Sequence, residues 1–406
     1  MEIASIVSAL RHHKAGAVLL ALQIGLTVAI VCNTLTIIKQ YMDQTQRPSG
    51  IDEPNIFTMY NQWVGDPPDL ESRVLGDLAA LRSLPDVVGA EAAGGYPLNG
   101  SGAAVGISRH PDQHYDDAWT TAVYYVDEQG QAAYGVKLVA GRWFRRDEIS
   151  IQHSADASNP AVIILTEWAA KFFFPDGNAV GRLVYLASPS PSRVIGVVER
   201  METPWAGLPH MDSFVERSVF LPYRYVSNGL WYVVHSRQGE QAEVMKAAQE
   251  KLYAMTPARV IDDVVPFSET RQRIYAHGRS SSLMLGALSV LLLTVTAFGV
   301  VGLTSYWVAQ RRRQIGMRRA LGARRMDILR YFHTENVLVA GSGAVLGIGL
   351  CLAGNLWLAH KLALTRVSPE HICVAALIVM GLSQMAVLWP ALRAAAIPAA
   401  AAIRDL

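Results

Sequence analysis

The sequence predicts an α-helical membrane protein with four transmembrane helices and a large α+β extracytoplasmic domain inserted between helices one and two. Two observations predict this fold class. Of the 406 residues, 51% are apolar and only 17% are charged, and four segments are apolar over the roughly 20 residues that a spanning helix needs. The long segment between the first two apolar runs contains no cysteine, so it must fold around a core of its own.

The predicted transmembrane segments are 16–38, 283–309, 336–359 and 372–392. The first two contain no charged residue, which favours membrane spans over buried core helices. No small-residue cleavage pattern follows the first segment, so we interpret it as an uncleaved anchor rather than a signal peptide.

Basic residues predict the orientation of these spans. Residues 311–330 contain eight arginines, and Lys and Arg accumulate on the cytoplasmic side of membrane proteins. The predicted cytoplasmic segments are 1–15, 310–335 and 393–406, and the predicted outer segments are 39–282 and 360–371. A multi-pass protein with both termini in the cytoplasm follows from this assignment.

Residues 1–15 place apolar side chains at helical spacing before a basic cluster, which is typical of an amphipathic helix on the inner membrane surface. A frayed, charged N-terminus fits the same residues. The sequence does not separate these two interpretations.

The outer segment 39–282 alternates strand-like and helix-like patterns. Strands are predicted at NIFTMY, AVIIL, SRVIGVVE, WYVVHSR and ARVIDDVVPF, and helices at DLESRVLGDLAALRSL, TEWAAKFFF and Gln241 to Met255. Thr166 is a suitable N-cap for the second of these helices. The alternation predicts an α+β domain built from two similar βαβ-like halves.

A search for chemical motifs excludes several classes of function. No phosphate-binding loop occurs, so ATP is not expected to bind this chain in that manner, and no catalytic set is recognisable. The stretch HPDQHYDD (110–117) gathers metal-ligand residue types, but no second cluster accompanies it, so we predict a polar loop and no metal site. The spans carry no Asp, Glu, Lys or Arg, which argues against an ion-coupled carrier. A nucleic-acid binder is contradicted by the spans themselves.

Gly343 and Gly347 lie four residues apart in the third span. This spacing lets the backbones of two membrane helices approach closely, so we predict that both glycines pack against another span.

The stretch RRRQIGMRRALGARRMDILRYFHTENVLVAGSGAVLGIGL (311–350) resembles the cytoplasmic loop and following helix of the MacB/FtsX-type ABC transporter permeases. LVAGRWF, FFFPDGNAVGR and RVIGVVE in the outer segment are similar to the periplasmic core domain of that family. The order of one span, a large outer domain and three further spans also fits. The resemblance covers nearly the whole chain and implies a permease subunit in the bacterial cytoplasmic (inner) membrane.

The resemblance implies that the loop 310–335 rests on a separate ATPase subunit, which would hold ATP and Mg, so that this chain carries no cofactor. The residues predicted to couple to that ATPase are Ile315, Gly316, Arg318, Arg319, Ala320, Leu321, Gly322, Ala323, Asp327 and Ile328. The sequence predicts two short helical pieces here, broken near LGA, and its arginines exceed what orientation requires. Retention of the loop in the cytoplasm, with contact to anionic lipid, is the alternative.

Two departures from the family pattern concern the same end of the molecule. Gln314 stands where the family usually has glutamate, and the tail RAAAIPAAAAIR places Pro398 one position early. These departures fit one member of an unequal permease pair.

The implied function is transmission of ATP-driven motion to the extracytoplasmic domain, for efflux of a peptide, antibiotic or lipid-linked substrate. The implied partners are ABC ATPase subunits, a second permease copy or a paralogous permease, and a periplasmic adaptor with an outer-membrane channel. The alternative is a non-transporting regulatory subunit that activates an extracytoplasmic cell-wall hydrolase.

Overall fold

The computed structural model describes residues 14–111, 119–153, 159–186, 188–208, 211, 214–362 and 367–396. Four predicted segments therefore lie wholly or partly outside the described residues: most of the interfacial helix 1–15, the middle of the loop 360–371, most of the tail 393–406 and most of the stretch 110–117. The chain divides into two compact units, which we call the helical unit (Met1–Thr45 and Gly278–Leu406) and the outer domain (Gln46–His277).

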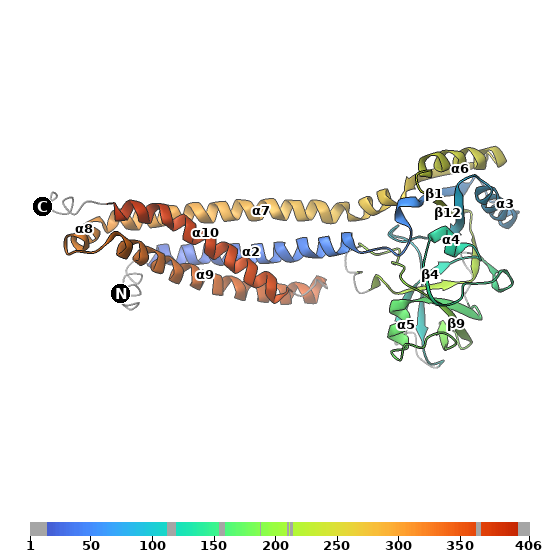
Figure 1. The fold of residues 1–406 in the computed structure, drawn as a ribbon, viewed down its shortest axis with the longest axis horizontal. Helices are drawn as coiled ribbons and strands as arrows, with labels where there is room; N and C mark the ends of the chain where they lie inside the picture. The colour runs from blue at the N-terminus through green and yellow to red at the C-terminus, as the bar shows by residue number, and fades with distance from the viewer. Residues whose placement is uncertain are drawn as a thin grey trace. The chain divides into compact units, whose positions relative to one another are not determined.

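The helical unit contains four helices that are long and apolar enough to cross a membrane. They run alongside one another, and a short helix lies at one end of them (Figure 1). The helices are α2 (Lys14–Gln46), α7 (Phe267–Gln310), α8 (Arg312–Ala320), α9 (Arg325–Leu362) and α10 (Pro369–Ala395). Each long helix extends past its predicted span, because hydropathy marks the apolar stretch while the polar residues beside it continue the helix.

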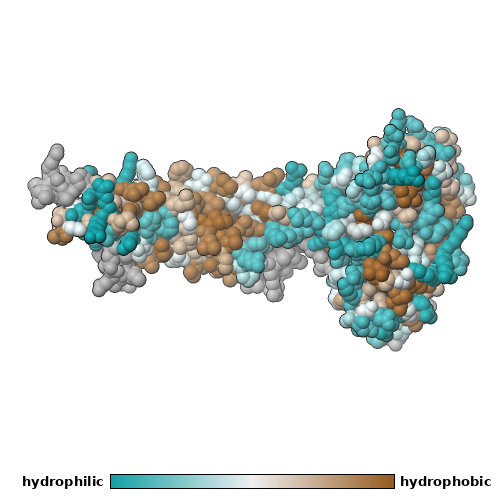
Figure 2. All heavy atoms as spheres, in the orientation of Figure 1, coloured by the Kyte–Doolittle hydropathy of each residue, from teal (hydrophilic) through white to brown (hydrophobic). Residues whose placement is uncertain are grey.

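Small residues let α2 and α9 approach closely. A Cβ on Gly347 would lie 2.4 Å from the Gly25 carbonyl oxygen, and one on Gly343 would lie 2.7 Å from the Ala21 carbonyl oxygen. Between α2 and α7, the hydroxyls of Thr27 and Thr296 lie 2.8 Å apart. Figure 2 shows that hydrophobic residues gather over the middle of the visible face of the helical unit, as expected of helices surrounded by lipid.

The first lobe of the outer domain is a four-stranded sheet in the order β13-β1-β12-β2, with antiparallel neighbours. Its elements are β1 (Ile56–Trp63), α3 (Leu70–Arg82), β2 (Val87–Ala93), β12 (Gly229–Ser236), α6 (Gln241–Met255) and β13 (Arg259–Pro266). The units β1-α3-β2 and β12-α6-β13 are each a βαβ whose parallel strands are separated by one antiparallel strand. This is a ferredoxin-like arrangement, and the predicted helix from Gln241 to Met255 is confirmed.

The predicted pair of βαβ-like halves thus forms one sheet, and a second lobe is inserted between them. A bidentate ion pair closes the core of the first lobe: Arg259 Nη1 and Nη2 lie 2.7 and 3.0 Å from the two carboxylate oxygens of Asp77. The Tyr232 hydroxyl donates to the same carboxylate at 2.7 Å. Both charged side chains are at most 1% exposed, so neighbouring groups must stabilise them in place of water.

The inserted lobe is a seven-stranded sheet in the order β5-β9-β7-β10-β4-β3-β8. Because β8 pairs with both β3 and β9, six of these strands form a closed barrel around an apolar core. The strands are β3 (Ala103–Ser108), β4 (Trp119–Tyr125), β5 (Leu138–Gly141), β7 (Val162–Thr166), β8 (Leu183–Leu186), β9 (Pro191–Val198) and β10 (Ser218–Leu221). The inserted segment also contains α5 (Glu167–Phe173), which packs on the barrel, and the 3-10 turn η3 (Arg146–Glu148). Its remaining elements α4 (Gly130–Tyr134), β6 (Ser150–His153) and β11 (Tyr223–Val226) pack against the first lobe, and η1 (Glu53–Asn55) precedes β1.

The helix α5 begins as the sequence predicts. Thr166 adopts an extended backbone, and its hydroxyl accepts a hydrogen bond from the Ala169 N–H at 3.5 Å. This interaction satisfies one of the N–H groups that a helix leaves unpaired at its start.

Candidate functional site: the basic turn between α8 and α9

The helix α8 ends in a hydrogen-bonded turn at Gly322. The Ala323 N–H donates to the Arg318 carbonyl at 3.0 Å, and the Gly322 N–H donates to the Arg319 carbonyl at 3.1 Å. This pair of bonds is a Schellman motif, in which the residue after the C-cap adopts a left-handed conformation. Gly322 has a φ of +96°, which a residue without Cβ adopts at little cost. The glycine therefore ends α8 and redirects the chain into α9.

Asp327 caps the start of α9. Its Oδ2 accepts a hydrogen bond from the Arg324 backbone N–H at 2.8 Å, and its own N–H donates to the Arg324 carbonyl at 3.0 Å. A carboxylate in the first helical turn also interacts favourably with the helix dipole. We define residues 311–330 as the basic turn.

A buried ion pair anchors the beginning of the basic turn to α9. Arg311 Nη1 lies 3.0 and 3.2 Å from the two carboxylate oxygens of Glu335, and it donates to the Tyr331 hydroxyl at 2.9 Å. Arg311 is 8% exposed and Glu335 is 1% exposed. Removal of either partner would leave a buried charge uncompensated, so this pair fixes α8 relative to α9.

Two further arginines connect α8 to its neighbours. Arg319 Nη1 donates to the Ala395 carbonyl at the end of α10 at 3.2 Å. The Arg318 guanidinium lies 5.2 Å from the centroid of the Tyr331 ring, a cation–π geometry. The basic turn is thus attached to both α9 and α10.

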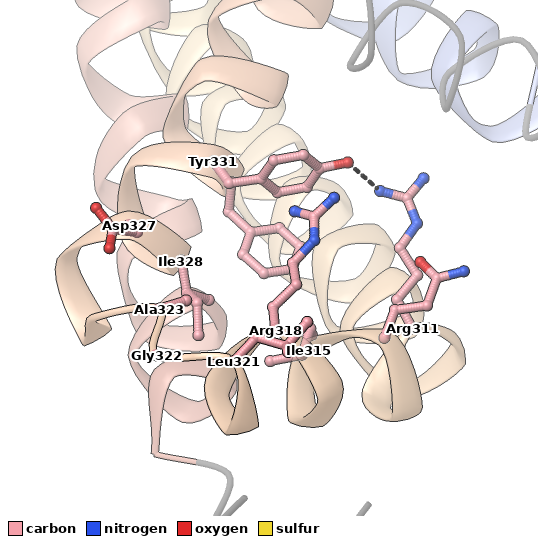
Figure 3. A pocket seen from close by; sticks show the side chains of 11 residues that line it. Arg311, Ile315, Arg318, Leu321, Gly322, Ala323, Asp327, Ile328 and Tyr331 are labelled. Carbon is pink, nitrogen blue, oxygen red and sulfur yellow. Dashed lines mark hydrogen bonds between the residues drawn. The ribbon is translucent and has the colours of Figure 1, made fainter. Parts of the chain in front are cut away.

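A cavity of about 440 Å³ opens between α8 and the start of α9 (Figure 3). The buried residues Ile315, Ile328 and Phe332 give it an apolar lining. Figure 3 shows the Arg318 side chain beside Tyr331, and the hydrogen bond from Arg311 to the tyrosine hydroxyl. The arrangement combines an apolar hollow with cationic side chains, which suits contact with another molecule better than bond-making chemistry.

The structure separates the predicted coupling residues by burial. Ile315 and Ile328 are each 6% exposed and belong to the apolar cluster of the helical unit, and Gly316 is buried. A partner would reach Ile328 only through the cavity between α8 and α9, which this residue lines. The second predicted helical piece is the first part of α9, so its apolar side packs into the bundle.

The remaining predicted residues lie at or near the surface. Leu321 is 85% exposed, directly before the turn glycine. Arg318, Ala320 and Gly322 are exposed, and Arg319, Ala323 and Asp327 are half-buried. The exposed residues form a basic surface with an apolar side chain at its tip.

Sequence reasoning missed five residues of this site. Met317 and Met326 are 58% and 57% exposed and flank Leu321 in the chain. Both methionines could have been noticed from the sequence, because they are apolar residues in a segment rich in arginine. Arg311, Tyr331 and Glu335 hold the turn in place, but their pairing depends on how α8 folds back against α9.

The outer domain holds a buried carboxyl that differs from the paired ones. Glu202 is fully buried, and no described residue donates a hydrogen bond to either of its carboxylate oxygens. The Arg271 guanidinium lies nearby, with its Nη2 3.7 Å from Glu202 Oε2. Burial raises the pKa of Glu202 to about 8, although Arg271 and Arg47 oppose the shift.

Comparisons with known proteins match both units. A model of the MacB-like periplasmic core domain matches residues 16–252, and a model of the FtsX-like permease C-terminal region matches residues 286–399. Both models describe permease domains.

Several relatives share this similarity. A macrolide export ATP-binding/permease protein MacB from Chromobacterium violaceum is 29% identical over 53% of this chain and 32% of its own length. A MacB 2 from Aeromonas hydrophila is 31% identical over 54% of this chain and 33% of its own length. The Bacillus subtilis ABC transporter permease YvrN is 24% identical over 56% of each chain. The chain thus spans about a third of the length of the MacB relatives it matches.

Among solved structures, the periplasmic region of MacB from Actinobacillus actinomycetemcomitans is 20% identical, with a TM-score of 0.33, over 55% of this chain and 94% of that chain. The assignment rests instead on the family models and on the fold described above. Because the periplasmic core-domain model alone matches more than half of the 406 residues, the chain belongs to the MacB/FtsX-type family of ABC transporter permeases.

Proposed function

We propose that this permease works with an ABC ATPase on a separate polypeptide, which would bind ATP and Mg, and that the basic turn is the surface on which the ATPase rests. The observation that carries the proposal is Leu321, which is 85% exposed at the end of α8 among exposed arginines. Exposed apolar residues surrounded by charge are typical of protein interfaces.

Retention in the cytoplasm is the simpler explanation of the arginines, but it does not require Leu321, Met317 or Met326 to be exposed. It also does not require the Schellman turn or the buried pair of Arg311 and Glu335. A surface that receives force from a partner needs both an exposed contact and a rigid attachment to the helices behind it. The basic turn has both features, which supports docking over retention alone.

The proposal places both termini in the cytoplasm. The eight arginines of residues 311–330 support this orientation. The test uses single cysteines at Lys171 and Ala320, both of which are exposed, in a cysteine-free chain. A membrane-impermeant thiol reagent should label position 171 in intact cells and spare position 320. The opposite pattern would reverse the orientation.

Motion would pass along α7, which follows β13 directly and ends one residue before α8. At about 1.5 Å per residue, its 44 residues exceed what a hydrocarbon core of roughly 30 Å requires.

The names of the MacB relatives favour export of a substrate over regulation of an extracytoplasmic enzyme. The proposed cargo is a peptide, an antibiotic or a lipid-linked compound, and the proposed assembly includes a second permease with an adaptor and an outer-membrane channel.

The test of coupling is the substitution Leu321→Asp, with Val88→Asp as the matched control. Val88 is an apolar residue of the outer domain that is 46% exposed. Leu321→Asp should leave the membrane level unchanged, because all eight arginines remain, but it should weaken co-purification with the cognate ATPase. Burial of an unpaired carboxylate at a protein contact costs several kcal/mol. Val88→Asp should co-purify like the wild type.

The variant Leu321→Asp could instead co-purify with the ATPase and stimulate it as well as the wild type does. That result would leave retention in the cytoplasm as the sole role of the basic turn. Export itself is tested in cells that carry either permease, by following ATP-dependent loss of candidate compounds. Suppose that the ATPase binds the wild type better than Leu321→Asp, but that no compound leaves the cell faster with the wild type. The export proposal then fails and the docking proposal stands.

A further inference from the structure

Arg217 of the outer domain makes cation–π contacts with two indole rings. Its guanidinium carbon is 4.7 Å from the ring centroid of Trp119 and 5.2 Å from that of Trp168. Among the described residues it has no ion-pair partner, and its buried Nε has no hydrogen-bond partner. Burial lowers the pKa of the Arg217 guanidinium, yet an arginine stays charged in proteins. The side chain is therefore a partly desolvated cation with unused donors.

The surface beside Arg217 is aromatic. Phe172 stacks on Trp168 with ring centroids 5.3 Å apart, and it meets Trp119 at 4.2 Å and an angle of 61°. Trp119 is 40% exposed and Phe172 is 38% exposed. Flat apolar side chains thus stay in contact with water next to a cation. Tryptophan and arginine are also the residues most enriched where binding energy concentrates.

Two elements, α5 and β4, hold the backbone of this cluster in place. The Thr166 hydroxyl, at the start of α5, donates to the Glu216 carbonyl at 2.9 Å. In β4, the Ala122 N–H donates to the Arg217 carbonyl at 2.7 Å. The backbone on both sides of the arginine is therefore fixed before any ligand arrives, which lowers the ordering cost of binding. The helix α5 and the strand β4 are labelled in Figure 1.

A second arginine of the same lobe shows what Arg217 lacks. Arg182 lies over the Phe174 ring at 5.8 Å, and its Nη2 is 2.6 Å from Asp176 Oδ2. This arginine combines a cation–π contact with a carboxylate of the chain itself. Arg217 has two aromatic contacts and no such carboxylate among the described residues.

We propose that Trp119, Phe172 and Arg217 form a binding site for a ligand that carries a carboxylate beside a flat aromatic group. The guanidinium donates to the carboxylate, because its planar fork matches two carboxylate oxygens. The aromatic group covers the exposed rings of Trp119 and Phe172, which removes apolar surface from water. The site lies in the outer domain and does not depend on the ATPase proposed above.

The test uses indole-3-acetate as the probe and indole-3-acetamide as its uncharged match. Both are titrated against the full chain in lipid nanodiscs, and binding is followed by saturation-transfer NMR. The acid should bind saturably and the amide at least about tenfold more weakly, since hydrogen bonds between charged groups contribute that much. Arg217→Gln should weaken binding of the acid by at least about tenfold, whereas Arg182→Gln should leave it unchanged.

The comparison of acid and amide needs no substitution, so it decides the proposal even if Arg217→Gln lowers the thermal midpoint of the outer domain. Trp119→Leu provides a second variant that keeps the arginine and removes one ring, and it should also weaken binding. Equal binding of acid and amide, absence of saturable binding of the acid, or full binding by Arg217→Gln would overturn the proposed site.

Discussion

The outer domain and the basic turn use charge in opposite ways. In the outer domain, Asp77 and Arg259 neutralise each other inside the core at 2.7 Å. In the basic turn, six of the eight arginines are exposed, Arg319 is half-buried and Arg311 is buried. Like charges that crowd on one surface destabilise an isolated chain. The difference indicates that charge in the outer domain stabilises the fold, whereas most of the charge in the basic turn stays exposed, as the docking proposed above requires.

The largest effect should come from breaking the buried pair of the outer domain. Asp77→Asn leaves Arg259 buried with no carboxylate, so the free energy of unfolding should fall by about 3–5 kcal/mol. Chemical denaturation of the full chain, followed by tryptophan fluorescence, measures this, because Trp63 lies 5.5 Å from the guanidinium. Arg237→Gln removes an exposed pair and should change little. An Asp77→Asn midpoint equal to that of the wild type would contradict the role assigned to the pair.

A smaller effect is expected for the single buried arginine of the basic turn. Arg311→Gln leaves the Glu335 carboxylate buried, and we expect a loss of about 2–3 kcal/mol from the charged hydrogen bonds. It should also abolish stimulation of the ATPase, because α8 loses its attachment to α9. Glu335→Gln keeps an oxygen that can accept from Arg311, so its thermal midpoint should lie between those of Arg311→Gln and the wild type. A milder effect of Arg311→Gln than of Glu335→Gln would reject this interpretation.

The stability of the outer domain should depend on pH through Glu202. Its pKa is about 8 in the folded state against an ordinary value of 4.5, so between these pH values the folded state holds a proton that the unfolded state has released. The contribution is complete below pH 4.5 and is lost as the pH rises through 8, with a slope of up to about 1.4 kcal/mol per pH unit. Glu202→Gln should remove this component from denaturation curves taken across the window. An unchanged pH profile would show that Glu202 titrates normally.

The smallest effect on stability is expected at Gly322. Gly322→Val and Gly177→Val both place a side chain at a positive φ, +96° and +79°, with open space around the Cβ. Each should cost about 1–2 kcal/mol through backbone strain alone. Only Gly322→Val should lower ATPase stimulation, since Gly177 belongs to the outer domain. Equal stimulation by the two variants would separate the Schellman turn from coupling.

Much of the fold could be predicted from local patterns. The four spans follow from apolar stretches, and α6 and the Thr166 cap follow from helical periodicity and capping chemistry. The order of the strands could not be predicted, because β1 and β12 pair across more than 160 residues and nothing local specifies that register. The closure of the barrel is another long-range pairing of this kind, because β8 pairs with β3, where Ile107 lies opposite Leu186.

The sequence located the segment that forms the candidate site, but it did not predict which side chains of that segment are exposed. Arg318 to Ala323 were assigned from a motif, which locates a segment but does not say which side chains face the bundle. The burial of Ile328 does not follow from the motif, because it depends on α9 beginning at Arg325 and on the apolar face of α9 joining the core. Met317 and Met326 were overlooked because their exposure depends on how α8 and α9 meet.

The most direct test of docking at the basic turn is site-specific photo-cross-linking. A photoreactive amino acid is placed at Leu321 in one chain and at Val88 in another, both positions being exposed, and cross-linked products are identified by mass spectrometry. We predict that position 321 cross-links to a protein carrying a phosphate-binding loop, and that position 88 does not. Cross-links from position 321 to lipid alone, or to the same proteins as position 88, would contradict docking and leave the arginines with a role in orientation only.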